Sequence, residues 1–181
     1  SQGFVLFHVE RIASHGGSIR VFAALFEAGR SVSEDVTNLI QLEKKAGLFD
    51  SAAYSKLTAQ IAEAGDRLTA EISAAKHAGR RIAGYGAPAK ATTLMHQFGL
   101  TNTDIEYIVD DSPWKQGLLS PGLNVPIFAS SQLEQQPVDD VVVLAWNFAD
   151  PIIENNKLFL TGNRRFIVPL PNLRMVSADD F

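Results

Sequence analysis

Residues 80–90 read Arg-Arg-Ile-Ala-Gly-Tyr-Gly-Ala-Pro-Ala-Lys, a short apolar strand that leads through a glycine-containing turn into a helix. Between a parallel strand and a helix, such a turn brings backbone N–H groups to a phosphate, and the helix N-terminus adds roughly half a positive charge. We expect Gly84 to form the tight turn, Gly86 to let the ligand approach the backbone, and Ala89 to allow close helix–strand packing. Pro88 suits the first helical turn, where its missing N–H needs no partner. The stretch predicts a phosphate-binding turn or, alternatively, a packing turn in an α/β protein.

Residues 79–181 alternate strand-like and helical segments. The expected strands are 81–83, 105–109, 141–145 and 165–168, and the expected helices lie near 88–98, 130–135 and 150–160. Strands separated by helices imply right-handed crossovers and a Rossmann-like, doubly wound and mainly parallel α/β sheet. Such sheets bind ligands beyond the carboxyl ends of their strands, where the strand order reverses. The residues that follow each strand are therefore the candidates for a binding site.

The N-terminal segment, residues 1–30, is expected to form a β-hairpin. Strand-like stretches at 4–12 and 18–25 flank the loop 13–17, and they alternate apolar and polar residues with β-branched and aromatic enrichment. A two-stranded hairpin is marginally stable by itself in water, so its apolar faces need another sheet or a neighbouring chain.

Residues 31–78 are expected to form a helical connector. Ser33 begins the first helix, a break follows near 47–50, and Ser51 caps the second helix. The apolar residues of the second helix recur at steps of three and four, which predicts packing against its own domain or a coiled-coil seam. Gly79, which follows two basic residues, ends that helix.

Composition excludes several classes of function. The chain has 181 residues, 20% of them charged, and a net charge of −4, so extended binding to nucleic acid is not expected. It has no cysteine, which excludes disulfides and thiolate zinc sites, and we expect no metal site. A signal peptide and a long apolar run are both missing, which predicts a soluble cytoplasmic protein without a membrane partner. The chain opens with Ser-Gln-Gly instead of Met, which suggests a piece of a longer protein.

Polar and aromatic residues follow the expected strands. Asp110 ends the second strand, where a Rossmann domain holds the ribose hydroxyls; alternatively, Asp110 and Asp111 form an Asx turn and a helix cap. Lys115 either completes a pocket over a nucleotide or sugar or is a solvated surface lysine. Trp146 leaves a buried strand beside Asn147, and the pair offers an aromatic stacking face next to an amide.

Several motifs, in order over nearly the whole chain, carry a family resemblance. They are Ser14–Val21, Gly84–Lys90 with Thr92–Leu94, Tyr107–Gly117, Pro121–Gly122 with Val125–Ile127, Ala145–Asn147 and Phe166–Pro169. Together they resemble the C-terminal domain of the S-adenosylmethionine-dependent sugar C-methyltransferases. The resemblance implies an enzyme that methylates a ring carbon next to the ketone of a nucleotide-linked keto-deoxysugar. It also implies a zinc domain and a central methyl-donor domain ahead of a Rossmann-like domain that helps to hold the nucleotide sugar.

The resemblance implies a substrate-binding role for one set of residues. The diphosphate would lie on Gly84, Tyr85, Gly86, Ala87, Pro88 and Lys90, and the nucleoside or sugar near Asp110, Lys115, Trp146 and Asn147. His15 either touches the substrate at a junction between domains or is a loop histidine bonded to backbone. No other catalytic residue is expected in this chain.

The resemblance also shows what the chain lacks. Family members carry cysteine ligands for zinc, and a Tyr-x-Glu-His stretch ahead of the His-Gly-Gly-Ser segment is thought to supply groups for proton abstraction. This chain has no cysteine and starts after that stretch. The hairpin is then expected to be the last two strands of a truncated methyl-donor domain. S-adenosylmethionine and zinc would belong to the full-length enzyme, and the fragment alone would bind no cofactor and be inactive.

Two other hypotheses remain open. One is an NAD(P)-binding or other dinucleotide-binding Rossmann module, which the glycine turn and Asp110 permit. Asp-Asp-Ser-Pro after the second strand and the lack of an evident hydride-handling set of His, Lys and Tyr residues disfavour it. The other is a structural piece whose hairpin or long helix forms a homodimer, because an unpartnered sheet edge invites pairing with a second copy.

Overall fold

The computed structural model describes residues 3–181. Contacts divide the chain into two compact units, of which the first ends at Gln60 and the second runs from Ile61 to Phe181. The division falls within the long helix α2 (Ser51–His77), so its first turns belong to one unit and its later turns to the other. No helix among the described residues is long and apolar enough to cross a membrane.

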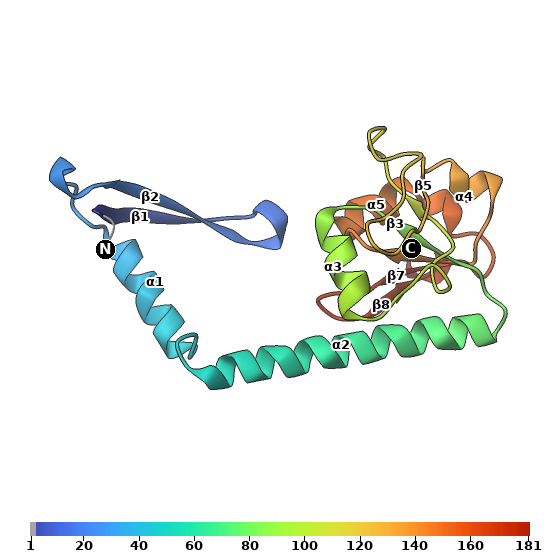
Figure 1. The fold of residues 1–181 in the computed structure, drawn as a ribbon, viewed down its shortest axis with the longest axis horizontal. Coiled ribbons are helices and arrows are strands. Elements are labelled where there is room, and N and C mark those ends of the chain that lie inside the picture. Colours follow the sequence, from blue (N-terminus) through green and yellow to red (C-terminus); the bar gives the residue numbers. More distant parts are fainter. Residues whose placement is uncertain (1–2) are drawn as a thin grey trace. The chain divides into compact units, whose positions relative to one another are not determined.

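The first unit contains the predicted hairpin. Strands β1 (Phe4–Ile12) and β2 (Ser18–Leu25) form the two arms of the hairpin in Figure 1. They pair antiparallel, with one irregularity in register between Leu6 and His8. Short 3-10 turns occupy Ser14–Gly16 and Phe26–Ala28, and helix α1 spans Glu34–Lys45. The prediction of a β-hairpin followed by helices is confirmed.

The two faces of the hairpin have different surroundings. On one side, the Ser33 N–H donates to the Phe7 carbonyl at 2.8 Å, and His8 Nδ1 lies 3.4 Å from Asp35 Oδ2. On the other side, the cross-strand register brings together apolar residues that are each between 45% and 58% exposed. We call this surface the apolar hairpin face; it consists of Phe4, Leu6, Ile19, Val21 and Leu25.

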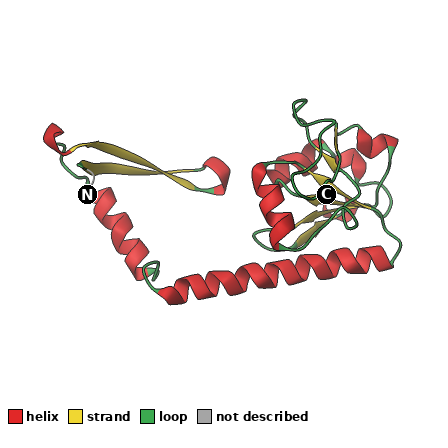
Figure 2. Cartoon of the chain, in the orientation of Figure 1, coloured by secondary structure: helices red, strands yellow, loops and turns green. Residues whose placement is uncertain are grey.

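The second unit is built on a six-stranded sheet of order β5-β4-β3-β6-β7-β8. Figure 2 shows the strands in yellow among the helices and loops. The strands are β3 (Ile82–Tyr85), β4 (Ile108–Val109), β5 (Ile127–Phe128), β6 (Asp140–Val143), β7 (Arg165–Val168) and β8 (Arg174–Val176). The first five run parallel, and only β8 is antiparallel to its neighbour. The predicted doubly wound, mainly parallel sheet is confirmed. Sequence reasoning missed the edge strands β5 and β8, which are too short for a periodicity signal.

Helices cover both faces of this sheet. Besides α2, they are α3 (Ala89–Gln97), α4 (Gln132–Gln135) and α5 (Ala149–Asn155), with 3-10 turns at Trp146–Phe148, Lys157–Phe159 and Ala178–Asp180. One core joins α2 and α3 to the sheet, and a second core joins α4 and α5 to it. Burying one large aliphatic side chain in such a core contributes roughly 1.5–3 kcal/mol.

Helix α2 divides its apolar stripe between two environments. Leu68, Ile72 and Ala75 are at most 3% exposed and belong to the core under the sheet. Tyr54 and Leu57, at the other end of the stripe, are 62% and 52% exposed. Packing against its own domain therefore accounts for the later half of the stripe.

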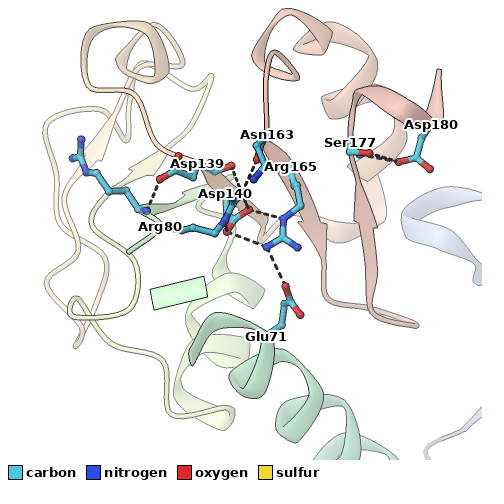
Figure 3. A network of polar contacts seen from close by, with 9 residues as sticks. Glu71, Arg80, Asp139, Asp140, Asn163, Arg165, Ser177 and Asp180 are labelled. Atoms are coloured by element: carbon cyan, nitrogen blue, oxygen red, sulfur yellow. Dashed lines mark hydrogen bonds and ion pairs between the residues drawn. The ribbon is translucent and has the colours of Figure 1, made fainter. Parts of the chain in front are cut away.

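An ion network around the buried Asp140 joins the amino ends of β6 and β7 to α2 (Figure 3). The carboxylate of Asp140 is fully buried and accepts two hydrogen bonds from Arg80, at 2.7 and 2.6 Å, and two from Arg165, at 2.9 and 3.2 Å. Arg165 also lies 3.0 Å from Glu71 on α2. Burial by itself would raise the pKa of Asp140, but the arginine hydrogen bonds outweigh it and lower that pKa. The network fastens α2 to the edge of the sheet away from the candidate site.

Candidate functional site

The order of the strands reverses between β3 and β6. From β3 the chain runs outward through β4 to β5, then crosses back to β6 and continues outward to β8. In doubly wound sheets, the crevice at this reversal, outside the carboxyl ends of the strands, is where ligands bind. The loops after β3 and β6 hold the two predicted motifs, residues 84–90 and 145–147, so the topology brings both motifs to this crevice.

Gly86 forms the turn after β3. Its φ of +90° lies in the region that favours glycine, and its N–H donates to the Val109 carbonyl at 2.7 Å. A Cβ on Gly86 would lie only 2.6 Å from the Cβ of Ala145. The turn therefore requires glycine for its backbone conformation and for its contact with the loop after β6, whether or not a ligand is bound.

Gly84 does not form the turn, and that expectation is wrong. It lies inside β3, where a Cβ would be 2.7 Å from the side chain of Leu144 and 3.1 Å from that of Ile108. Gly84 instead allows these two core side chains to pack against the strand. Pro88 precedes α3 with an extended backbone, at the N-cap position.

The carboxylate of Asp110 holds the glycine turn in place. It accepts hydrogen bonds from the Ala87 N–H at 2.6 Å, from the Ser112 N–H at 2.9 Å and from Lys115 Nζ at 3.0 Å. The bond to Ser112 is the Asx turn that the sequence offered as an alternative. Burial would raise the pKa of Asp110, but these three donors outweigh it and lower that pKa. Three donors already use most of the lone pairs of the carboxylate, which leaves little capacity for a ribose.

Tyr85 lies beneath the turn, in the core that contains α5. The residue is 4% exposed, and its hydroxyl donates to Asp111 at 3.0 Å and accepts from Asn156 Nδ2 at 3.3 Å. Burial raises the pKa of this phenol to about 12. Tyr85 thus connects the loop after β4 to α5, and its predicted contact with a substrate stays a prediction.

Lys90, in the first turn of α3, meets the loop after β6. Its Nζ lies 4.3 Å from the centroid of the Trp146 ring and 5.8 Å from that of Phe148, and it donates to Asn147 Oδ1. Burial lowers the pKa of Lys90. Among the residues that the structure describes, Lys90 has no carboxylate partner. Among these described residues, two aromatic faces and an amide oxygen surround its positive charge.

Asn147 leaves a polar group unsatisfied at the same place. Within residues 3–181, its Nδ2 is the one buried side-chain nitrogen or oxygen that lacks a hydrogen-bond partner. A buried amide donor without an acceptor is costly, which makes this group a candidate for contact with a ligand.

Trp146 is half-buried and packs against both cores of the sheet. Because Lys90 lies over its ring, the indole is already engaged in a cation–π contact. A shallow pocket of about 340 Å³ begins beside it at the carboxyl ends of β6 and β7. Its lining residues include Trp146, Asn147, Val168, Pro171 and Arg174.

Apart from Gly84 and residues 86–88 of the turn, the predicted residues fall into three groups. Lys90, Trp146 and Asn147 meet at the crevice, whereas Asp110, Lys115 and Tyr85 support the neighbouring loops. His15 lies in the other unit, in a 3-10 turn with a φ of +54°, and its role stays a prediction.

Sequence reasoning did not single out Trp114, which is 88% exposed in the loop after β4. The sequence signal that could have identified Trp114 was its position within the family motif 107–117.

Comparison with known proteins places the chain in a family. Residues 13–171 match the family described as the C-methyltransferase C-terminal domain. The chain is also 34% identical over 179 residues to the C-methyltransferase NovU of Streptomyces niveus, an alignment that covers 99% of this chain and 43% of the relative. It therefore spans less than half the length of that relative. Because the family match covers most of the sequence, the chain belongs to the C-methyltransferase C-terminal domain family.

Proposed function

We propose that this chain is the substrate-holding part of an S-adenosylmethionine-dependent C-methyltransferase that acts on a nucleotide-linked keto-deoxysugar. The family and the C-methyltransferase NovU support the methyltransferase assignment. The chain spans 43% of that relative, so we assign the methyl-donor groups to the rest of the enzyme and expect the isolated chain to be inactive.

The observation that carries the proposal is the pairing of Lys90 with Asn147. Within residues 3–181, a partly desolvated ammonium group without a carboxylate partner lies beside a buried amide donor without an acceptor. One anionic group can satisfy both, and charge-assisted hydrogen bonds of this kind are the strong ones. The first N–H groups of α3, beside Lys90, add further donors, as helix N-termini do in many phosphate sites. A diphosphate fits this set of donors better than a neutral sugar does.

Other residues act on this site through the backbone. Asp110 holds the Ala87 N–H at 2.6 Å, so that donor positions the turn and is not offered to the ligand. Lys115, which is held by the same carboxylate, places a second positive charge beside the turn.

Position matters for the reaction that we propose. Loss of a proton next to the ketone would give an enolate, whose carbon would take the methyl group in line as the bond from that methyl to the donor sulfonium breaks and a neutral thioether leaves. Holding the two substrates in one geometry contributes up to roughly 7–11 kcal/mol in ideal cases. The residues of this chain would supply orientation of the nucleotide sugar, with the proton acceptor located elsewhere in the enzyme.

We assign zinc and S-adenosylmethionine to other parts of the enzyme. The chain has no cysteine to supply thiolate ligands, and residues 3–181 contain no group of three or more side chains that could hold a metal ion. The apolar hairpin face would pack against the methyl-donor domain, with β1 and β2 as the last strands of its sheet. In the isolated chain, the same face would be free to pair with a second copy.

Titration calorimetry with thymidine diphosphate tests the proposal. We expect binding to the intact chain and a loss of about tenfold or more in affinity for Lys90→Met, because the charge-assisted bond is removed. Lys56→Met, an exposed lysine in the first unit, is the matched control and should bind as the wild type does.

The same titration with NAD tests the competing hypothesis. Binding of NAD without any response to thymidine diphosphate would favour a dinucleotide-binding module and sink the proposal. Gly86→Asp is a poorer probe than Lys90→Met, because its side chain would collide with Ala145 before meeting a phosphate.

A further inference from the structure

The two tryptophans of the chain differ in their surroundings. Trp146 is half-buried under Lys90, whereas Trp114 is 88% exposed. Among the described residues, no aromatic ring or cation contacts the Trp114 indole. Trp114 is thus a large, solvent-exposed aromatic side chain at the end of the sheet where doubly wound folds bind ligands. Such exposure requires an explanation.

Hydrogen bonds fix the loop that carries Trp114, both before and after this residue. Before it, the Ser112 N–H donates to Asp110 Oδ1 at 2.9 Å. After it, Gln116 Nε2 donates to the Asp110 carbonyl at 3.0 Å, and the Gly117 N–H donates to the Ile127 carbonyl at 2.8 Å. The exposed indole thus stands on a fixed backbone, which reduces the entropy lost when a ligand packs against it.

The same loop is tied to the glycine turn. Asp110 Oδ2 accepts from Ala87 in that turn and from Lys115, the residue directly after Trp114. Strand β4, which ends at Asp110, neighbours β3 on the side away from β6. The turn is therefore flanked by the Trp114 loop on one side and by Trp146 and Asn147 on the other.

We infer that Trp114 is the stacking surface for the base of the nucleotide whose diphosphate lies on Lys90 and Asn147. The inference rests on the proposed function and replaces Trp146 as the base-stacking residue, because Lys90 already lies over the Trp146 ring. Lys115 pairs with the same carboxylate oxygen of Asp110 that accepts from Ala87, so this cation lies next to the turn and adjoins Trp114 in sequence. Stacking of a base on an aromatic side chain tolerates any base and strengthens binding by roughly 5- to 100-fold.

Calorimetry on the intact chain separates the base from the diphosphate. Trp114→Leu should bind thymidine diphosphate roughly 5- to 100-fold more weakly and inorganic pyrophosphate with unchanged affinity. Leu118→Ala, which alters another exposed apolar residue of the same loop, is the matched control and should bind both ligands normally. Because Trp114 is exposed, the urea midpoint of its variant should match that of the wild type.

Fluorine NMR of the chain labelled with 5-fluorotryptophan gives a second readout. Two resonances are expected, and Trp114→Phe identifies the one from Trp114. Thymidine diphosphate should shift that resonance, and pyrophosphate should leave it in place. Unchanged affinity of Trp114→Leu for thymidine diphosphate overturns the inference while the proposed function stands. No binding of thymidine diphosphate by the wild type, or equal binding by Lys90→Met, overturns the proposed function itself.

Discussion

Two buried aspartates lie at opposite ends of the parallel strands, and they are stabilised in different ways. We call the side of the sheet where these strands begin the amino edge, and the side where they end the carboxyl edge. Asp140, at the amino edge, is held by two arginines through four hydrogen bonds. Asp110, at the carboxyl edge, is held by two backbone N–H groups and one lysine. In both cases burial would raise the pKa of the carboxyl group, and the surrounding donors lower it instead.

The difference shows how stability and binding are divided in this domain. At the amino edge, the charges of Arg80, Arg165 and Asp140 satisfy one another within the protein. At the carboxyl edge, Lys90 lacks a carboxylate partner and Asn147 retains a free donor, both among the described residues. At the amino ends of the strands the charged groups satisfy one another, whereas our proposal assigns the donors at the carboxyl ends to an anionic ligand.

The largest effect is expected from breaking the amino edge. Asp140→Asn leaves two arginines without their carboxylate, and removing one partner from a buried ion network costs about 3–5 kcal/mol. Urea unfolding should show this loss. Asp150→Asn is the control, because Asp150 is 82% exposed and its pair with Arg174 is worth at most about 1 kcal/mol. An Asp140→Asn variant as stable as that control would contradict the structural role of the network.

A smaller loss is expected from the glycine turn at the carboxyl edge. Gly86→Ala combines a positive φ with a collision against Ala145, whereas Gly117→Ala has a φ of +79° and no atom within 4 Å of the added Cβ. The conformation costs about 1–2 kcal/mol in each variant, and overpacking adds about 1–3 kcal/mol to Gly86→Ala alone.

Urea midpoints of the two glycine variants give the difference directly. Calorimetry should also show weaker binding of thymidine diphosphate by Gly86→Ala, because the loop that carries Trp146 must move. Equal stability of the two variants would show that the contact between the loops is loose.

The smallest expected effect is the change of folding stability with pH. The folded-state pKa values of Asp140 and Asp110 are lowered, so these carboxylates stabilise the fold above the ordinary aspartate pKa of about 3.9. That stability is lost as the pH falls through the lower folded-state values. When unfolding is measured from pH 7 down to pH 3, the urea concentration at the midpoint should therefore decrease once the pH is below about 5. The gap between wild type and Asp140→Asn should narrow over the same range, and a constant gap would contradict the lowered pKa of Asp140.

Much of the fold follows from local patterns. The hairpin, the break before α2 and the alternation of strands and helices are visible in periodicity and in glycine positions such as Gly79, whose φ is +73°. Strands β5 and β8 were missed because their two and three residues carry no period of their own. Their pairing depends on neighbouring strands that are distant in sequence.

The site divides in a similar way. The residues 84–90, 110–117 and 145–147 were identified because they follow strands, and the topology brings their loops to one edge. Their roles were harder to predict. The local sequence does not show that the side chain of Leu144 requires a glycine at position 84. Nor does it show that the carboxylate of Asp110 accepts a hydrogen bond from the Ala87 N–H.

The amino-acid sequence alone established the α/β class, the order of the elements and the family resemblance, because these depend on local periodicity and on motifs read along the chain. The tertiary structure was needed to show that Lys90 meets Asn147 across 57 residues and that Trp114 is exposed while Trp146 is not. The physical reason is that burial and hydrogen-bond partners are set by loops from different strands. Such loops meet only when the whole sheet has formed.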